Sequence, residues 1–490
     1  MKLSELLSRS GIMRIAGFTD PEVVSAVLDS RRLRAGDLFL AMRGSRQDGN
    51  DWADAALASG ACAVLTDRPD QASLPGRVLV PSVADAIGPV CRLLAGCPDE
   101  GWPVLAVTGT NGKTSSAYLA EAVFKAAGLA PAMSSTVAMR HPLGEAVSNM
   151  TTPDPVDLWR FLAEARQAGA RSLVLETSSH ALSQGRIGGV LASAAVFTNL
   201  SRDHLDYHGS MEEYFEAKAL LFTRHLRPDG IAVSNVDDPW GRILSDRLGA
   251  RCRRISLGAS DADWRIESLR CGLDGNSFVL VGPGGQRLAL SSPLVGEVFA
   301  RNLAGVAVAC LELGIDPRAI REAALATTVP GRCQLVKVGG LRGAVDYAHT
   351  PDALERLLSG LRPLVPGRLV CVFGCGGDRD RGKRPQMGEI AARLADLAVA
   401  TSDNPRTEDP ESILDGIFSG VPAGAAVLRE VDRRTALARA AADLREGDFL
   451  VVAGKGHEDY QIVGSEKRHF DDVEELERAL ARREGETCRN

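Results

Sequence analysis

The feature that most constrains the fold is a set of short, nearly continuous apolar segments separated by longer stretches with helical spacing. The six clearest segments are residues 104–109, 172–177, 194–200, 367–377, 397–404 and 449–456. Strands that are apolar on both faces are typical of parallel sheets that helices cover on both sides. The intervening stretch 115–128 has helical periodicity and ends in Gly. The chain is therefore predicted to be an α/β protein.

A chain of 490 residues is too long for one hydrophobic core, and its composition falls into three blocks. Residues 1–98 contain short apolar runs broken by Gly and Asp, and residues 97–103 (CPDEGWP) are predicted to be a linker. The clearest strand patterns divide between residues 99–331 and 332–490. We therefore predict three α/β domains with these bounds: a small N-terminal domain, a central parallel-sheet domain and a C-terminal Rossmann-like domain.

The overall composition disfavours several classes of protein. The net charge is −6 and no long basic run is present, which argues against a nucleic-acid partner. The N-terminus lacks a signal-peptide pattern, and no apolar stretch approaches the roughly 18 residues of a membrane span. Ten cysteines show no metal-ligand spacing, and the nearest pair, Cys371 and Cys375, is predicted to be two reduced core thiols. We expect a cytoplasmic protein that does not insert into membranes.

A glycine-rich loop follows the first strand of the central block, in residues 107–115 (VTGTNGKTS). Backbone N–H groups of such a loop and of the helix that follows can bind phosphates. Lys113 would add a charge at the β- and γ-phosphates, and the Thr114 hydroxyl could bind Mg²⁺. The complete pattern would have Gly where this chain has Val107, and the alternative is an ordinary turn. The predicted ATP-binding residues of the loop are Gly109, Thr110, Asn111, Gly112, Lys113, Thr114 and Ser115.

Three further polar residues follow the strands of the same block. Glu176 lies at one strand end, His204 follows the next strand, and Lys218 lies in the helical stretch 211–222. A carboxylate, an imidazole and an amine beside a phosphate site make chemical sense if a cation binds among them. Taken alone, Lys218 would be interpreted as a solvated helix residue. Together, the three are predicted to be functional.

The C-terminal block has a polar cluster after each of three strands. Three such clusters at adjacent strand ends can converge on one zwitterionic ligand. Asp403 and Glu458 could bind ammonium groups, whereas Arg379 and Arg406 could bind carboxylates, for which the planar guanidinium is well suited. The alternative for residues 403–406 is a Pro turn with a solvated Arg. The predicted residues of this site are Arg379, Asp403, Asn404, Pro405, Arg406, Gly454 and Glu458.

The shortened loop TGTNGKT resembles the ATP site of the Mur ligase family and of the related folylpolyglutamate synthases, and the likeness covers essentially the whole chain. It implies that Thr114 and Glu176 hold one Mg²⁺ and that His204 helps to hold a second. It also implies that CO₂ carbamylates Lys218, so that this residue supports magnesium. The implied catalytic residues are Lys113, Glu176, His204 and Lys218. Further ATP contacts are implied for Asn302, Arg332 and Asp346.

The resemblance also extends to a nucleotide-linked peptide substrate. Residues 28–31 (LDSR) and the turn at residues 45–47 resemble the UDP-binding domain of the family. Met150 stands where many members have Asn, a departure that affects one expected hydrogen bond. The residues implied to bind the UDP-muramoyl dipeptide are Leu28, Ser30, Ser45, Arg46, Gln47, Thr151, Thr152, Ser178, Gln184 and Arg186.

Residues 403–406 (DNPR) resemble the signature of family members that select meso-2,6-diaminopimelate. The physical logic agrees, because a site built for a second carboxylate rejects lysine, which would leave an Arg unpaired. The implied activity is ATP-dependent addition of this amino acid to UDP-N-acetylmuramoyl-L-alanyl-D-glutamate through an acyl phosphate. This reaction belongs to peptidoglycan precursor synthesis, and a monomer is expected.

Two alternatives remain at this point. A folylpolyglutamate synthase would share the central architecture but gives no reason for residues 28–31 and 403–406. A regulatory nucleotide-binding module would keep the fold without chemistry. The presence of Lys113, Glu176, His204 and Lys218 argues against that second alternative.

Overall fold

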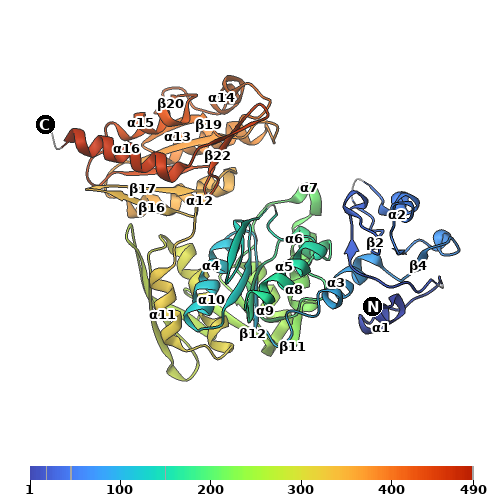
Figure 1. Cartoon of the computed structure of the whole chain (residues 1–490). Helices are drawn as coiled ribbons and strands as arrows, with labels where there is room; N and C mark the ends of the chain where they lie inside the picture. The colour runs from blue at the N-terminus through green and yellow to red at the C-terminus, as the bar shows by residue number, and fades with distance from the viewer. Residues whose placement is uncertain (18, 45–46, 149, 488–490) are drawn as a thin grey trace. The chain divides into compact units, whose positions relative to one another are not determined.

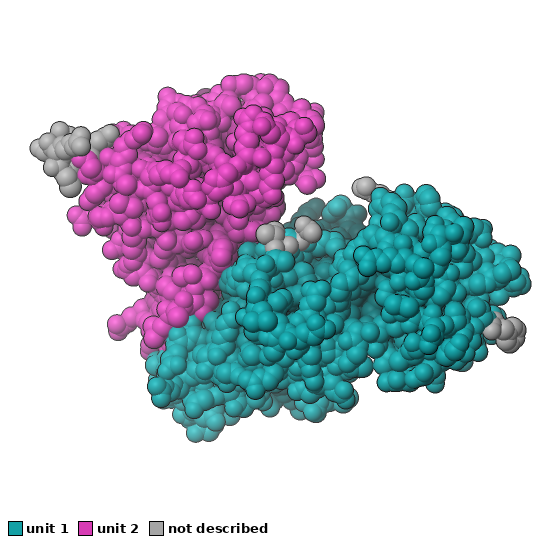
Figure 2. Space-filling model, viewed as in Figure 1, with its two compact units in different colours: residues 1–267, 279–289, 301–324 teal, residues 268–278, 290–300, 325–490 magenta. Residues whose placement is uncertain are grey.

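The computed structural model describes residues 1–17, 19–44, 47–148 and 150–487 (Figure 1). These residues form two compact units, coloured separately in Figure 2. Unit 1 comprises residues 1–267, 279–289 and 301–324, and unit 2 comprises residues 268–278, 290–300 and 325–490. None of the helices in this part of the chain is both long and apolar enough to cross a membrane.

The N-terminal part of unit 1 contains a four-stranded parallel sheet in the order β1-β2-β3-β4. Its strands are β1 (Ala26–Val27), β2 (Leu38–Leu40), β3 (Ala63–Thr66) and β4 (Arg77–Leu79). Its helices are α1 (Leu3–Arg9), α2 (Ala53–Ala58) and α3 (Val83–Leu94). Every residue of β2, β3 and β4 is buried, as expected for short strands covered on both faces.

The central sheet has eleven strands in the order β15-β14-β13-β12-β11-β10-β5-β9-β6-β7-β8. They are β5 (Val104–Thr108), β6 (Pro131–Ser134), β7 (Ala138–His141), β8 (Gly144–Val147), β9 (Ser172–Glu176), β10 (Ala192–Phe197), β11 (Leu226–Asn235), β12 (Cys252–Ser256), β13 (Trp264–Gly272), β14 (Gly275–Val281) and β15 (Arg287–Ser292). Strand β5 pairs in parallel with both β9 and β10. The carboxyl ends of these three strands therefore meet at one edge, where the glycine-rich loop begins.

The helices of the central region connect these strands. They are α4 (Lys113–Ala126), α5 (Pro155–Gln167), α6 (Ser179–Ser183), α7 (Leu205–His208), α8 (Met211–Thr223), α9 (Pro239–Leu248), α10 (Glu297–Glu312) and α11 (Pro317–Ala326). Strands β6, β7 and β8 form an antiparallel extension at one side of the sheet. The parallel strands predicted from the apolar segments are thus confirmed, and the antiparallel extension is an addition to them.

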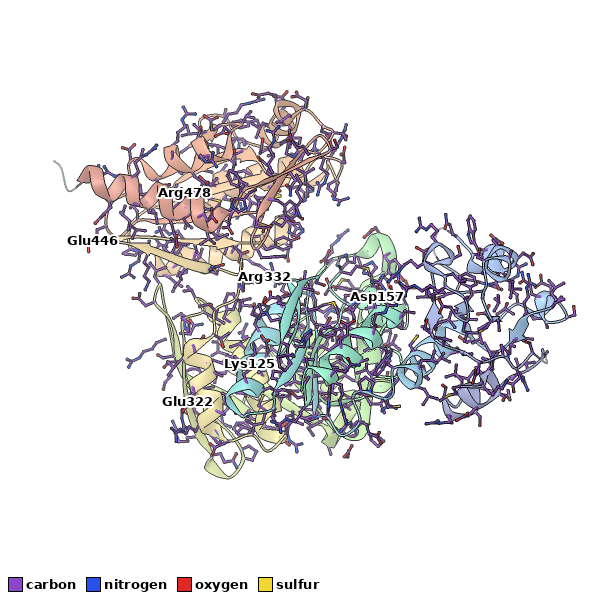
Figure 3. All side chains as sticks on the ribbon, in the orientation of Figure 1. Lys125, Asp157, Glu322, Arg332, Glu446 and Arg478 are labelled. Carbon is purple, nitrogen blue, oxygen red and sulfur yellow. The ribbon has the colours of Figure 1, made fainter. Side chains whose placement is uncertain are left out.

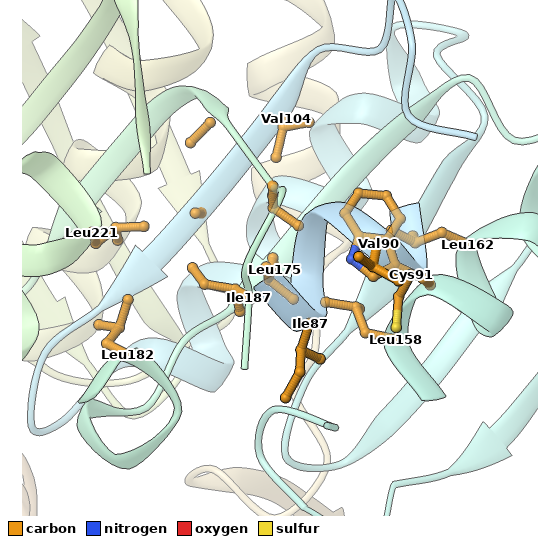
Figure 4. Close-up of a cluster of buried hydrophobic side chains, with 14 of the residues drawn as sticks. Ile87, Val90, Cys91, Val104, Leu158, Leu162, Leu175, Leu182, Ile187 and Leu221 are labelled. Atoms are coloured by element: carbon orange, nitrogen blue, oxygen red, sulfur yellow. The ribbon is translucent and has the colours of Figure 1, made fainter. Parts of the chain in front are cut away.

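One hydrophobic core joins the N-terminal and central parts of unit 1. Figure 4 shows Ile87 and Val90 of α3 beside Leu158 of α5 and Leu175 of β9. Burying each such side chain contributes about 1.5–3 kcal/mol. Helix α3 also comes very near the backbone after α6, because a Cβ on Gly88 would lie 2.1 Å from the carbonyl carbon of Gly188. The two parts therefore form one compact body.

Unit 2 contains a six-stranded sheet in the order β16-β17-β21-β18-β19-β20. Its strands are β16 (Gln334–Val338), β17 (Leu341–Asp346), β18 (Leu369–Cys375), β19 (Leu397–Ser402), β20 (Val427–Arg429) and β21 (Phe449–Ala453), beside a hairpin of β22 (Tyr460–Val463) and β23 (Glu466–His469). Its helices are α12 (Pro351–Leu361), α13 (Lys383–Leu394), α14 (Pro410–Phe418), α15 (Arg433–Ala441) and α16 (Asp472–Thr487). Only β16 pairs antiparallel among the strands of the six-stranded sheet.

Alternate residues of β18 contribute to two different cores. Leu369, Cys371 and Phe373 lie in one hydrophobic cluster, whereas Val370 and Val372 lie in the other. This two-residue period explains why the strand is continuously apolar, since helices cover both faces of the sheet. Cys371 is a buried free thiol in this arrangement, as predicted. The three-domain α/β class is confirmed, while the exact domain bounds at residues 98 and 331 remain a prediction.

Candidate active site

The glycine-rich loop between β5 and α4 has a backbone that only glycine permits at two positions. Gly109 and Gly112 have φ values of 149° and 87°. A Cβ on Gly109 would lie 1.9 Å from the Thr198 hydroxyl oxygen, and one on Gly112 would lie 2.5 Å from Oδ1 of Asn302. Asn302, predicted to contact ATP, is itself buried and faces this loop. The glycines therefore let the loop lie directly against its neighbours.

Two loop N–H groups are used to hold the loop in place. Thr110 N donates to Asn199 O at 2.8 Å, and Asn111 N donates to Asn199 Oδ1 at 3.1 Å. The N–H groups in the first turn of α4, which begins at Lys113, form a candidate anion-binding site, because the start of a helix favours negative charge. Within the predicted phosphate site, Thr110 and Asn111 thus shape the loop. Thr114 and Ser115 lie at the helix start, as the predicted phosphate site requires.

Two lysines converge on the carbonyl oxygen of Gly109. Lys113 Nζ donates to it at 3.1 Å and Lys218 Nζ donates to it at 2.6 Å. Lys218 is 1 % exposed and its Nζ lies 4.5 Å from the ring centre of Tyr214. Burial, and then the positive charge of Lys113, lower the pKa of Lys218 well below its usual value. Lys218 is therefore buried, which excludes the alternative of a solvated helix residue that the sequence analysis had set aside.

Glu176 is buried beside the first turn of α4. Its Oε1 accepts hydrogen bonds from the hydroxyls of Thr114 at 3.1 Å and Thr136 at 2.9 Å, and its Oε2 accepts one from the backbone N–H of Thr136 at 2.8 Å. Thr136 was not predicted from sequence, because it lies in no motif and 40 residues from Glu176. The carboxylate and the Thr114 hydroxyl offer two oxygens at the phosphate site.

No cluster of three or more His, Cys, Asp or Glu side chains suited to a metal occurs among the described residues. Mg²⁺ commonly takes one or two protein oxygens and completes its shell with water and substrate phosphates. Thr114 and Glu176 fit that requirement. The residues predicted to hold a second ion, His204 and Lys218, both lie beside the Tyr214 ring. The ring centres of His204 and Tyr214 are 6.1 Å apart.

His204 belongs to a group of rings built from α6, α7 and α8. Its own backbone is left-handed, with a φ of 52°, and its ring centre lies 4.9 Å from that of His180. His208 is buried and hydrogen-bonds Ser179 Oγ through Nε2 at 2.9 Å. Burial lowers the pKa of His208 to about 4, so its ring is neutral near pH 7. Sequence analysis did not identify His180 or His208.

The residues predicted to hold the dipeptide lie together at the carboxyl end of β9. Arg186 Nη1 donates to Thr152 O at 3.2 Å, and its Nε donates to Gln184 Oε1 at 2.9 Å. Thr152 Oγ1 in turn accepts from the backbone N–H of Ser178 at 3.2 Å. The remaining member, Thr151, accepts a hydrogen bond from Thr136 at 3.0 Å. Arg186 Nη1 also lies 3.4 Å from Sδ of Met150, which replaces the usual Asn.

The predicted uridine-binding residues lie in the N-terminal part of unit 1. Leu28 packs against the main core, and Ser30 begins a 3₁₀ turn that Asp29 caps. Gln47 accepts a hydrogen bond from Gly44 N at 2.8 Å through its backbone carbonyl. Ser45 and Arg46 lie outside the described residues. The last residue of the 3₁₀ turn, Arg32, donates to Asp157 of α5 at 3.2 Å, and Figure 3 labels Asp157.

Two predicted ATP contacts lie in unit 2. Asp346 ends β17, and its carboxylate accepts hydrogen bonds from Cys333 N at 2.7 Å and Ala348 N at 2.8 Å. Burial raises the pKa of Asp346, and the nearby Arg332 opposes that shift. Arg332, labelled in Figure 3, lies 4.7 Å above the ring of Tyr347. The structure therefore brings Arg332 and Asp346 close together.

The predicted amino-acid site lies at the carboxyl ends of β18, β19 and β21. Asn404 Nδ2 donates to Glu458 Oε2 at 2.8 Å, and a Cβ on Gly454 would lie 2.7 Å from Asp403 Oδ2. On the other side, a Cβ on Gly376 would lie 2.9 Å from Arg406 Nη1 and 3.7 Å from Arg379 Cγ. Pro405 packs beside them, since its carbonyl oxygen would be 1.9 Å from a Cβ on Gly377. All seven predicted residues belong to this edge of the sheet.

Two buried cations support this site, and sequence analysis assigned a role to neither. Lys455 is 0 % exposed and lies 3.5 Å from Glu458, whose pKa burial raises. Arg433 is fully buried with Asp472, donating to its two carboxylate oxygens at 2.8 and 2.7 Å. Arg433 also donates to the carbonyls of Ser402 at 3.3 Å and Ala453 at 3.1 Å, the last residues of β19 and β21. It therefore holds the two strand ends that precede Asp403 and Gly454.

Comparison with known proteins agrees with this geometry. Three family models match the chain: "Mur ligase family, catalytic domain" over residues 23–104, "Mur ligase middle domain" over residues 107–310, and "Mur ligase, glutamate ligase domain" over residues 331–456. A UDP-N-acetylmuramoyl-L-alanyl-D-glutamate–2,6-diaminopimelate ligase from Parasynechococcus marenigrum (strain WH8102) is 46 % identical over 98 % of this chain and 99 % of its own. The enzyme of the same name from Gloeobacter violaceus is 44 % identical over 99 % of each chain.

Solved structures give the same result. The structure of a UDP-N-acetylmuramoyl-L-alanyl-D-glutamate–2,6-diaminopimelate ligase is 35 % identical, covers 94 % of this chain and 95 % of its own, and has a TM-score of 0.70. A MurF ligase from Thermotoga maritima in complex with ADP is 20 % identical, covers 94 % of this chain and 98 % of its own, and has a TM-score of 0.60. A folylpolyglutamate synthase from Mycobacterium tuberculosis in complex with ADP, 23 % identical with a TM-score of 0.60, covers 76 % of this chain and 92 % of its own. The last two show a shared fold alone.

Proposed function

This chain belongs to the Mur ligase family, and from that membership we propose that it adds meso-2,6-diaminopimelate to UDP-N-acetylmuramoyl-L-alanyl-D-glutamate in peptidoglycan precursor synthesis. It does so as an ATP-dependent ligase that forms an amide bond. Relatives named for this reaction with 2,6-diaminopimelate are 42–46 % identical, seven of the eight over 98–99 % of this chain and one over 91 %. The folylpolyglutamate alternative has weaker support, because the likeness to that enzyme is at the level of fold.

The observation that carries the proposal is the charge pattern of the unit 2 site. Arg379 and Arg406 both lie near the Cβ position of Gly376, while the carboxyl side chains of Asp403 and Glu458 lie at the neighbouring strand ends. Two cationic and two acidic groups match an amino acid with two carboxylates and two ammonium groups. Diaminopimelate has that pattern, whereas lysine has a single carboxylate and would leave one arginine without its partner.

ATP supplies the driving force for the bond. We place its phosphates at the start of α4, with the Lys113 ammonium, held by the carbonyls of Gly109 and Thr110, beside them. The γ-phosphoryl group is transferred to the γ-carboxylate of the D-Glu residue, which gives an acyl phosphate and ADP. An amine of diaminopimelate then attacks the acyl carbon, the C–O bond to phosphate breaks, and the amine loses a proton. Positioning of the three substrates provides much of the acceleration.

We propose that two Mg²⁺ ions bind here, one at Thr114 and Glu176 and the other at His204 and a carbamylated Lys218. When bound, magnesium would offset the negative charge of the phosphates. The neutral Lys218 amine would form an N–C bond with CO₂ and release a proton, which gives a carbamate anion. Support for this comes from the burial of Lys218 and from its lowered pKa, because the reactive form is the uncharged amine.

The dipeptide substrate would bind at the edge of the central sheet that carries Arg186. That guanidinium, held by Thr152 and Gln184, is suited to a carboxylate or phosphate of the substrate. Leu28, Ser30 and the turn around Gln47 would contact the uridine diphosphate. We expect the reaction to take place in the cytoplasm, because it uses ATP and a UDP-linked substrate. We also expect the enzyme to be a monomer.

Phosphate release tests the proposal directly. The protein is incubated with ATP, Mg²⁺ and the UDP-muramoyl dipeptide, and either meso-diaminopimelate or L-lysine is added in parallel. Turnover with diaminopimelate alone supports the ligase and its specificity. Turnover with lysine would keep the ligase and remove the specificity. No release with either amino acid, together with release on a folate substrate and glutamate, would favour the folylpolyglutamate alternative.

A further inference from the structure

Two adjacent loops carry the two arginines of the amino-acid site. Arg379 lies in the loop after β18 and Arg406 lies in the loop after β19, and these strands are parallel neighbours. The loops also touch through their backbones, since Gly377 N donates to Asn404 O at 2.9 Å. Arg406 Nη1 donates to Gly377 O at 2.8 Å. The distance between the two guanidinium groups therefore depends on how one loop is held against the other.

Glu408 connects the two loops from the second of them. Its side chain is 11 % exposed, and its Oε1 accepts hydrogen bonds from Asp378 N at 2.6 Å and from Arg384 Nη2 at 2.9 Å. Arg384 also donates to Oε2 at 3.1 Å, and Arg381 Nη2 lies 3.2 Å from that oxygen. The hydrogen bond from Arg384 and then the one from Asp378 N lower the pKa of Glu408. Its carboxylate thus stays ionised while it holds the first loop.

A reciprocal contact completes the connection. The carboxylate of Asp378 accepts hydrogen bonds from Thr407 N at 3.1 Å and from Thr407 Oγ1 at 2.8 Å. Asp378 immediately precedes Arg379, and Thr407 immediately follows Arg406. Both of these loops are backbone-strained at this point, because Asp378 and Arg406 have φ values of 55° and 53°. Side-chain contacts therefore maintain a conformation that the backbone alone would not favour.

We propose that Glu408 is a positioning residue that sets the spacing between Arg379 and Arg406 and thereby selects an amino acid with two carboxylates. This inference rests on the proposed function of the site. A ligand with two carboxylates must meet both guanidinium groups at once, so a loop shift of about 1 Å weakens its binding. An amino acid with one carboxylate can meet one arginine whatever the distance to the other. The link through Glu408 therefore affects the first kind of substrate and not the second.

The test compares Glu408→Gln with Glu411→Gln in the full-length enzyme. Glu411 is a matched control, because it also pairs with an arginine, Arg429, but at the surface with 57 % of its side chain exposed. For each variant, KM and kcat are measured for meso-diaminopimelate, L-lysine, ATP and the UDP-muramoyl dipeptide. We expect Glu408→Gln to raise KM for meso-diaminopimelate about tenfold or more, with KM for ATP and dipeptide within about twofold. The preference for diaminopimelate over lysine should fall by the same factor.

The outcomes separate the inference from the proposed function. If the unmodified enzyme does not use meso-diaminopimelate, the proposed function fails. If it does, and Glu408→Gln leaves the preference over lysine unchanged or weakens all substrates equally, Glu408 has no positioning role. Glu408→Asp keeps the charge and should recover part of the preference.

A milder variant covers the case in which Glu408→Gln does not fold, as judged by its thermal unfolding. Thr407→Val removes the hydroxyl contact to Asp378 at the surface. It should lower the preference for meso-diaminopimelate by about two- to fivefold. An unchanged preference in folded Thr407→Val would overturn the inference.

Discussion

The proposed phosphate-binding edge of unit 1 and the proposed amino-acid-binding edge of unit 2 both lie at the carboxyl ends of parallel strands, but they are organised by different forces. At the first edge, backbone groups set the geometry, as when the Gly109 carbonyl accepts from two lysines. At the second, charged side chains from distant segments set it, as in the buried pair of Arg433 and Asp472. The residues of contiguous loops are therefore recognisable in the sequence at both edges, whereas the long-range ion pairs that support the second edge are not.

The buried cations of the two edges show the chemical consequence. Lys218 donates to a neutral carbonyl oxygen at 2.6 Å, and burial lowers its pKa well below the usual value. Arg433 is equally buried, but Asp472 more than offsets the effect of burial and raises its pKa. An amine that is kept neutral can react with an electrophile, whereas a guanidinium that stays charged serves as a fixed support. Burial thus favours an uncharged amine at one edge, whereas the buried guanidinium at the other edge stays charged beside Asp472.

The strongest test of this contrast is Lys218→Ala. If the amine carries a catalytic carbamate, its removal should lower turnover by about 10²–10³-fold, and acetate or another small carboxylic acid should restore part of it. Lys125→Ala is the control, because Lys125 lies on α4 with 57 % of its side chain exposed and pairs with Glu121. The measurement is phosphate release with saturating substrates. Full activity of Lys218→Ala without added acid would refute the reactive role.

Arg433→Met tests the structural side of the contrast. Removal of one partner leaves Asp472 as an uncompensated buried charge, so the free energy of unfolding should fall by about 3–5 kcal/mol. The double variant Arg433→Met/Asp472→Leu should lose less free energy of unfolding than Arg433→Met alone, since neither buried charge remains. The control Arg434→Met removes a neighbour whose side chain is 64 % exposed. It should change stability by about 0–1 kcal/mol. Equal losses for Arg433→Met and Arg434→Met in urea unfolding would contradict the buried-pair argument.

Arg406→Ala sharpens the comparison at the level of substrate choice. Loss of a charged hydrogen-bond donor should lower kcat/KM for meso-diaminopimelate by about 10–100-fold, while KM for ATP, which binds at the other edge, should stay unchanged. Arg429→Ala, which removes a surface arginine paired with Glu411 and Asp415, is the matched control. Steady-state kinetics on both variants gives the answer. Unchanged use of diaminopimelate by Arg406→Ala would remove the specificity argument.

His457 offers the smallest expected effect, a dependence of stability on pH. Burial, and then the charge of Arg332, lower the pKa of His457 to about 4. The unfolded chain binds this proton near pH 6.5, so stability should be complete above that pH and should decline as the pH falls toward 4, by roughly 1–3 kcal/mol. His457→Gln should flatten this part of the curve in urea unfolding at several pH values. His469→Gln, which replaces an exposed histidine, should not flatten the curve. Identical curves for the two variants would contradict the prediction.

Sequence analysis identified the residues that belong to contiguous motifs and missed those that support them from elsewhere. The loop 109–115 and the segment 403–406 were identified because strand, turn and residue type coincide within a few positions. Thr136, Lys455 and Glu408 were not, although each forms hydrogen bonds to a predicted residue or its loop. These partners lie between 30 and 51 positions away in the chain. No local pattern marks such a residue.

The sequence by itself determined the α/β class, the order of apolar strands and the two strand edges at which we propose that ligands bind, because strand burial and loop composition are local properties of the chain. Tertiary structure alone decided the protonation behaviour of the charged residues. The sequence predicted a functional Lys218 but not its 1 % exposure, and Arg433 acquires its role from Asp472, 39 positions away. Desolvation and ion pairing depend on which groups surround a charge in three dimensions, and that neighbourhood is created by folding.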